Sequence, residues 1–194
     1  MSKIYIFLIL LMFWGCQQKG NSIDINSIKI PNTQLTKSDQ ALKKQAGKWL
    51  YKGKAYSGWI IEKYPNGETK SKTPYYQGSE HGLVKGWFPG GQKWFERPYI
   101  LGKKNGVHKT WWPSGQIKRQ ADIQQDIYEG NVKEWYHDGR LYKDFNYKNG
   151  HEAGHQRAWK SDGRIRANYV VENGRRYGLT GVTNCRNVVE KKQN

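Results

Sequence analysis

Short stretches that alternate apolar and polar residues fill most of the chain, and tight-turn residues separate them. Gly58 to Tyr64 alternates in this way, Pro65-Asn66-Gly67 follows as a turn, and residues 68–76 alternate again. A period of two is typical of a β-strand, and asparagine followed by glycine is typical of a hairpin turn. Each such unit is therefore predicted to be a β-hairpin.

The same hairpin returns every 24 residues without an insertion or deletion. Four columns of residues keep this step together: two of glycine, one of tryptophan and one of mixed aromatic residues. Their members are Gly67, Gly91, Gly115, Gly139 and Gly163; Gly58, Gly82, Gly106, Gly130, Gly154 and Gly178; Trp87, Trp111, Trp135 and Trp159; and Tyr64, Phe88, Trp112 and Tyr136. A fixed period of this length indicates a repeat architecture in which each unit packs against its neighbours. The sequence predicts an all-β fold, an extended antiparallel meander of 24-residue β-hairpin repeats.

The first residues have the pattern of a targeting segment rather than of a membrane span. After a short basic start, an apolar run extends from Ile4 to Trp14. A bilayer core requires about 20 helical residues, so a run this short favours a signal peptide. The run ends in Phe13-Trp14-Gly15-Cys16, which resembles a bacterial lipobox and implies lipidation of Cys16. Gln17 after the cysteine resembles the outer-membrane sorting class. The alternative is an ordinary secretory signal with an incidental cysteine.

The rest of the chain divides by composition. A polar segment with isolated isoleucines predicts a flexible tether, with a brief helix over Asp39 to Ala46 that Ser38 would cap and Gly47 would end. Trp49 to Ser57 is expected to be a partial first unit that caps the array. The predicted boundaries are residues 1–15 for the signal peptide, 16–46 for the lipidated N-terminus and tether, 47–184 for the repeat domain and 185–194 for a basic C-terminal tail.

Charge limits the class of partner. The formal net charge is +17, spread along the chain, which favours solubility and attraction to anionic surfaces or polymers. The chain has two cysteines and neither belongs to a CxxC pair, so cysteine chemistry does not hold the fold together.

One face of the predicted sheet carries a repeated pair of cation and tryptophan. Strand alternation places Leu83, Lys85 and Trp87 on the same face, and later repeats carry similar sets. The candidate ligand-binding residues are Lys85, Trp87, Lys109, Trp111, Lys133, Trp135, Arg157 and Trp159. Successive copies about 10 Å apart could hold an extended anionic or sugar-like polymer through stacking and charge. Alternatively, the tryptophans are the structural spine of a thin sheet, and lysine stems cover their edges.

The glycine columns and the aromatic–x–Asn/Asp-Gly turns resemble MORN-type repeats, in the bacterial variant associated with the YwqK family of antitoxins. Tyr51 to Gly58 is similar to the usual first segment of that family. The resemblance implies a β-hairpin repeat that serves as a binding surface. For the antitoxin family, it further implies neutralisation of a toxin by direct binding.

His151-Glu152-Ala153-Gly154-His155 matches the H-E-x-x-H pattern of zinc peptidases, and a zinc hydrolase built on these histidines is one alternative function. That pattern requires a helix, whereas Gly154 belongs to a glycine column and the segment aligns with turns. His81, His108 and His137 stand alone and are expected to be surface or packing residues. No nucleophile with a partnered base and no phosphate-binding loop is evident. We expect no catalytic residues, no cofactor and no metal.

These observations predict a non-enzymatic, lipid-anchored binding or scaffold module at the bacterial cell envelope, at the outer membrane. Its partner would be a protein or an anionic envelope polymer, and nucleic acid is not expected there. The alternative is an antitoxin or immunity protein that neutralises a toxin by direct binding.

Overall fold

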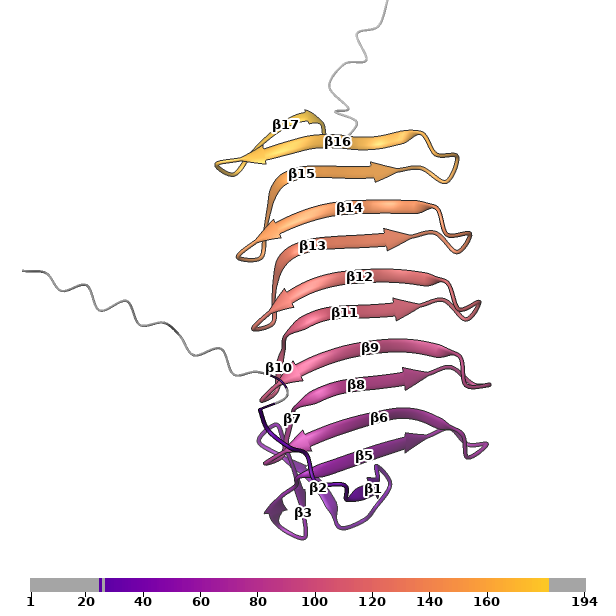
Figure 1. The fold of residues 1–194 in the computed structure, drawn as a ribbon, viewed down its shortest axis with the longest axis vertical. Coiled ribbons are helices and arrows are strands. Elements are labelled where there is room, and N and C mark those ends of the chain that lie inside the picture. Colours follow the sequence, from indigo (N-terminus) through magenta and orange to yellow (C-terminus); the bar gives the residue numbers. More distant parts are fainter. Residues whose placement is uncertain (1–24, 26, 182–194) are drawn as a thin grey trace, which may run out of the picture.

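The computed structural model describes residues 25 and 27–181, and it confirms the all-β antiparallel meander (Figure 1). Within these residues a 14-stranded sheet runs along the molecule and a 3-stranded sheet stands at its N-terminal end. The path through the large sheet is β1-β5-β6-β8-β9-β11-β12-β13-β14-β15-β16-β17, so from β5 onward the order in space follows the order in sequence. No helix that could cross a membrane is found among the described residues.

Five hairpins with the 24-residue step form the body of the large sheet. They are β5 (Gly58–Lys63) with β6 (Thr69–Tyr76), β8 (Gly82–Trp87) with β9 (Lys93–Ile100), β11 (Gly106–Trp111) with β12 (Ile117–Gln124), β13 (Ile127–Trp135) with β14 (Leu141–Lys148), and β15 (His151–Trp159) with β16 (Ile165–Glu172). The remaining strands of this sheet are β1 (Gln34–Thr36), β7 (Ser79–Glu80), β10 (Lys103–Lys104) and β17 (Arg175–Leu179). The small sheet contains β2 (Leu42–Gln45), β3 (Lys48–Tyr51) and β4 (Lys54–Ala55).

Two kinds of turn alternate along the meander. Inside a hairpin, the Gly115 amide donates to the Trp112 carbonyl at 2.9 Å, and Gly115 has a φ of 86°. Between hairpins, both central residues have positive φ, as at Asn149 (50°) and Gly150 (79°), which is the geometry of the tightest hairpin turns. Asp126 occupies a glycine position of the second kind with a φ of 70°, and aspartate tolerates this region better than most residues.

A β-bulge follows the turn inside each hairpin. In the third hairpin Thr110 pairs with Arg119 and Trp111 pairs with Ile117, so Lys118 is the extra residue. Lys118 lies over the ring of Trp112, with its Nζ 4.2 Å from the ring centroid. The same step elsewhere gives the bulge residues Lys70, Trp94, Tyr142 and Arg166. Three of these also lie near the aromatic column: Lys70 over Tyr64, Trp94 beside Phe88 and Tyr142 beside Tyr136.

Beyond strand pairing, hydrogen bonds join successive hairpins along the two long sides of the sheet: the side with the turns inside hairpins, here named the turn edge, and the opposite side. At the turn edge, a side chain of the aromatic column donates to the carbonyl of the next tryptophan: Tyr64 to Trp87 at 2.9 Å, Trp112 to Trp135 at 3.3 Å, and Tyr136 to Trp159 at 3.0 Å. Phe88 occupies the same column, but its side chain has no hydrogen-bond donor. At the opposite edge, turn amides donate to the preceding hairpin, as Gly102 does to Glu80 at 2.7 Å and Gly150 to Tyr128 at 2.9 Å.

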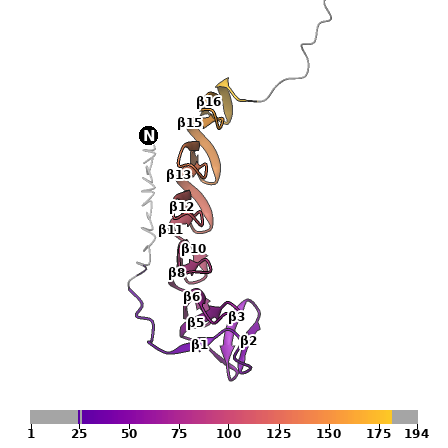
Figure 2. The ribbon, with the colours of Figure 1, turned by 90° about the vertical axis from the view of Figure 1, so that its right-hand side faces the viewer.

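The two faces of the sheet differ in burial, and the array is a single layer (Figure 2). The face that bears Val84, His108, Val132 and Gln156, here named the buried face, holds three apolar clusters spaced along the array. The first cluster joins Leu42 of the small sheet to Ile60 and Tyr75 of the first hairpin. The small sheet therefore covers the N-terminal end of the buried face.

The helix predicted over Asp39 to Ala46 is wrong. Leu42–Gln45 is a strand, and Ala46 and Gly47 have positive φ values of 46° and 78° that turn the chain directly into β3. The Asp39 carboxylate accepts a hydrogen bond from the Ala41 amide at 2.8 Å, which shapes a turn before β2. Burial of Leu42 and this turn chemistry override a short, weak helix pattern.

Ordered β-structure also begins earlier than the sequence predicts. In the described part of the 16–46 segment, β1 pairs in parallel with β5 and β2 joins the small sheet, so regular structure starts at Gln34 rather than at Gly47. The partial unit expected over Trp49 to Ser57 belongs to the small sheet and caps the array together with β2. The signal segment, Cys16 and the 185–194 tail lie outside the described residues.

The hydrogen bonds at the turn edge can be tested at the position that lacks one. Tyr136→Phe removes the bond to the Trp159 carbonyl and should lower the free energy of unfolding by about 0.5–1.5 kcal/mol. Phe88→Tyr should add the equivalent bond to the next hairpin and raise stability by up to about 1 kcal/mol. Urea denaturation measures both. Tyr51→Phe, which removes a hydroxyl outside this column, is the control, and equal losses in Tyr51→Phe and Tyr136→Phe would contradict the assignment.

Candidate binding surface

The eight candidate ligand-binding residues predicted from the sequence, Lys85 to Trp159, are here named the Trp/Lys ladder. They lie on the face opposite the buried one, here named the open face. Strand registers connect its cations into one continuous cross-strand row. The row is Ile61, Lys72, Lys85, Glu96, Lys109, Gln120, Lys133, Asp144, Arg157, Asn168 and Leu179. All four cations of the predicted ladder are therefore brought into line, one in each hairpin from β8–β9 onward.

Residues of the returning strands separate the cations of this row, which sequence reasoning missed. Glu96 stands between Lys85 and Lys109, and Asp144 stands between Lys133 and Arg157. Opposite charges directly across a strand pair stabilise the sheet. Two carboxylates thus interrupt the row, whereas Lys72 and Lys85 lie directly opposite each other and only Gln120 stands between Lys109 and Lys133.

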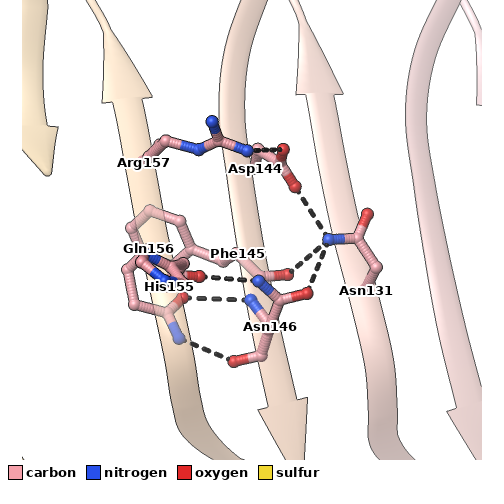
Figure 3. A network of polar contacts seen from close by, with 7 residues as sticks. All are labelled: Asn131, Asp144, Phe145, Asn146, His155, Gln156 and Arg157. Carbon is pink, nitrogen blue, oxygen red and sulfur yellow. Dashed lines mark hydrogen bonds and ion pairs between the residues drawn. The ribbon is translucent and has the colours of Figure 1, made fainter. Parts of the chain in front are cut away.

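A polar network on the open face holds Arg157, the fourth cation of the ladder (Figure 3). Arg157 Nη2 lies 3.2 Å from Asp144 Oδ2, and Asn131 Nδ2 donates to Asp144 Oδ1 at 2.7 Å. Asn131 Nδ2 also lies within hydrogen-bond distance of the Phe145 carbonyl and of Asn146 Oδ1, at 3.2 and 3.0 Å. Asp144 is buried, so its charge is held by these two partners. Arg157 is therefore a structural cation rather than a free one.

Gln156 extends the network through the sheet. Its side chain is fully buried, and it closes a gap between β14 and β15 by accepting from the Asn146 amide at 3.0 Å and donating to the Asn146 carbonyl at 2.8 Å. Asn146 Nδ2 in turn donates to the His155 carbonyl at 2.6 Å (Figure 3). Two repeats earlier, His108 occupies the same column and its Nε2 contacts the Pro98 carbonyl at 3.0 Å. These polar side chains replace backbone pairing where the ladder is interrupted.

The tryptophans of the predicted ladder are half-buried, and cations lie over some of their rings. Lys93 Nζ is 5.3 Å from the centroid of the Trp111 ring, and the Arg157 guanidinium is 5.9 Å from that of Trp159. The backbone carbonyls of Trp87, Trp135 and Trp159 accept the turn-edge hydrogen bonds described above. The column thus has a structural role in joining hairpins, and the ring surface that stays exposed is what a ligand could contact.

A groove on the open face lies at its N-terminal end. It encloses about 750 Å³ between β1, the first hairpin and the turn after β8. Trp87 forms part of its lining together with Lys63 and Lys72. Glu68, also in the lining, is engaged by the Gly90 amide at 3.0 Å, and this hydrogen bond is the main reason that the pKa of Glu68 is lowered. Sequence reasoning missed this groove because β1 completes it.

The H-E-x-x-H segment is strand, not helix. His151 and His155 both lie in β15, where Gly154 has a φ of 68°, so the helical turn that would direct both side chains to one ion is absent. Glu152 accepts hydrogen bonds from the Tyr169 hydroxyl at 2.9 Å and from Arg176 at 3.1 Å. Among the described residues, no group of three or more possible ligands could hold a metal ion. The geometry that this zinc motif requires is not formed.

Two of the three isolated histidines, which the sequence predicts to be surface or packing residues, are packing residues. His81 is fully buried, and its Nδ1 accepts a hydrogen bond from the Leu101 amide at 3.3 Å. His108 is 7% exposed, and its pKa is lowered to about 4 by burial first and then by nearby positive charges. His137 is exposed in a turn.

A family model described as MORN repeat variant matches residues 104–124 and 128–149. The two matches coincide with hairpins β11–β12 and β13–β14. No curated protein matches the chain. The other three hairpins have the same bulge and turn positions, so the repeat geometry extends to both sides of the matched segment. MORN repeats are generally binding or scaffold modules, which is consistent with a non-enzymatic role.

The buried histidine generates a prediction for the pH dependence of stability. The folded state holds His108 neutral, because its pKa is about 4, whereas the unfolded chain binds a proton near the ordinary pKa of about 6.5. The free energy of unfolding should therefore fall as the pH decreases from about 6.5 to about 4. His108→Gln should flatten this part of the curve, since Gln156 already fills the same column. Thermal melting across this range, with exposed His137→Gln as control, checks it. An unchanged slope in His108→Gln would contradict the prediction.

Proposed function

We propose that this protein is a non-enzymatic MORN-repeat binding module of the bacterial cell envelope, and that the open face engages an anionic envelope polymer. The observation that carries the proposal is the groove of about 750 Å³ where Trp87, Lys63 and Lys72 come together. An aromatic face beside unpaired cations suits a chain of sugar-like units with negative charges.

The distribution of ion pairs supports the open face from the first to the fourth hairpin as the ligand site. Among the described residues, Lys72, Lys85, Lys109 and Lys133 have no carboxylate within ion-pair distance, whereas Arg157 is paired with Asp144. Glu96 stands near two of these lysines in the row, yet its ion pair is with Lys93, at 3.0 Å. Four cations on one face therefore remain available to an anionic ligand.

We further propose that residues 1–15 are a signal peptide and that Cys16 carries the lipid that anchors the protein at the outer membrane. The basic start, the short apolar run and the Phe13-Trp14-Gly15-Cys16 ending support this proposal. A tether between Cys16 and β1 would separate the repeat array from the lipid. A protein of the envelope is the other partner that the open face could engage.

Removing the free cations of the row should weaken polymer binding while the fold is retained. A variant with glutamine at Lys72, Lys85, Lys109 and Lys133 should bind dextran sulfate at least about tenfold more weakly than the wild type, because each lost contact removes charge pairing and counterion release. Fluorescence anisotropy with labelled dextran sulfate measures the affinity, and uncharged dextran is the ligand control.

The matched control removes the same number of positive charges from positions outside the row. Lys43, Lys48, Lys54 and Lys148 are exposed, lie outside the row, and have no ion pair among the described residues. Their glutamine variant should bind almost as the wild type does. Equal loss in the two variants would mean that net charge alone is responsible, and equal binding by wild type and row variant would assign the open face to structure.

The anchor is tested by fractionating cells that express the full chain or its Cys16→Ala variant. We expect the wild type in the membrane fraction with incorporated labelled fatty acid, and the variant without either. A soluble wild-type protein that retains residues 1–15 would contradict the envelope proposal. That result would favour the alternative proposal, an antitoxin or immunity protein that neutralises a toxin by direct binding.

A further inference from the structure

A second cluster of cations lies on the buried face, opposite the Trp/Lys ladder. A pocket of about 180 Å³ between the second, third and fourth hairpins is lined by Arg97, Lys104, His108 and Arg119, together with the Tyr128 ring. These residues come from β9, β10, β11, β12 and β13, so the pocket exists only when three successive hairpins are stacked. No sequence motif indicates it, because its members occupy different positions of the repeat.

Neighbouring side chains restrain the two arginines of this pocket. The Arg97 guanidinium lies 4.3 Å from the centroid of the Phe95 ring. Arg119 donates from Nη2 to the Tyr128 hydroxyl at 2.6 Å and from Nε to Glu134 Oε1 at 3.3 Å. Because packing and hydrogen bonds restrain both guanidinium groups, little rotamer entropy is lost when they bind an anion.

The pocket has an excess of positive charge. Arg119 is paired with Glu134, but among the described residues Arg97 and Lys104 have no carboxylate within 4.0 Å of their charged nitrogens. The nearby Asp126 is paired with Lys103 at 2.9 Å. His108 contributes no charge at neutral pH, since its pKa is lowered to about 4 by burial and then by the charges of Arg97, Lys104 and Arg119. Arg97 and Lys104 are therefore the two cations of the pocket without an ion pair to any residue that the structure describes, while Glu80 and Asp126 interact with Lys104 over a longer range.

We propose that this pocket binds the phosphate monoester group of a soluble molecule. A phosphate monoester carries a charge of about −1.5 to −2 at neutral pH, which balances the two unpaired cations, whereas a carboxylate or a phosphodiester balances only one. Its oxygens match the forked donors of arginine. The volume is about six times the roughly 30 Å³ that a water molecule occupies in the liquid, so the group fits with part of its ester.

The proposal is independent of polymer binding on the open face, because the two sets of cations lie on opposite faces of one sheet. The test titrates the full-length protein with glycerol 1-phosphate by calorimetry at low ionic strength and pH 8. Dimethyl phosphate and acetate serve as the singly charged comparisons. We expect glycerol 1-phosphate to bind at least about tenfold more tightly than either, because the second charge gains a second cation as partner.

Two variants keep the result interpretable. Arg97→Gln and Lys104→Gln should each weaken glycerol 1-phosphate binding by about tenfold or more, since each removes one of the two unpaired cations. Lys104 is exposed and packs on no aromatic ring of the described residues, so its replacement should leave the fold intact even if Arg97→Gln disturbs the contact with Phe95. Lys148→Gln, which removes an exposed lysine outside both sites, is the matched control and should bind as the wild type does.

Three outcomes would overturn the proposal. The first is equal affinity for the monoester, the diester and acetate, and the second is unchanged binding in both Arg97→Gln and Lys104→Gln. The third is capture of the protein by vesicles that contain phosphatidic acid without any binding of glycerol 1-phosphate, which would assign the cations to a membrane surface instead.

Discussion

The hydrogen bonds that join each hairpin to the next are the interaction on which this structure depends. A sheet of one layer has no second layer to bury its face, and the three apolar clusters of the buried face are small and separate. The interactions that stabilise the array are therefore those between adjacent hairpins. In three of the four later hairpins, the carbonyl of the tryptophan at the bulge accepts a hydrogen bond from the aromatic column of the preceding hairpin.

Much of the fold could be predicted from the period alone. Gly115 and its equivalents mark turns because few other residues adopt positive φ, and the tryptophan column marks where each first strand ends. The N-terminal region could not be predicted in this way, because it has no period. There, the burial of Leu42 and the Ala46-Gly47 turn decide the structure, and the burial of Leu42 depends on Ile60 and Tyr75, far along the chain.

The candidate site could be predicted only in part. Alternation within a strand placed Lys85 and Trp87 on one face, but it says nothing of which residue of the returning strand lies between two lysines. That depends on register, which the bulges shift by one residue. Asp144 and Glu96 were missed for this reason, as was the burial of Asp144 under Asn131 and Arg157. The pocket around Arg97 depends on the stacking of three hairpins and has no signal in the sequence.

The unbroken 24-residue step gives the array a property that a compact domain lacks. Each hairpin adds two strands, which advances the sheet by about 10 Å. The separation between the small sheet and β17 is therefore a multiple of one fixed length, set by how many hairpins the gene encodes. Duplication or loss of one unit would change the distance between the two ends by about 10 Å without altering any hairpin between them. The length of the array can therefore change in steps of one hairpin.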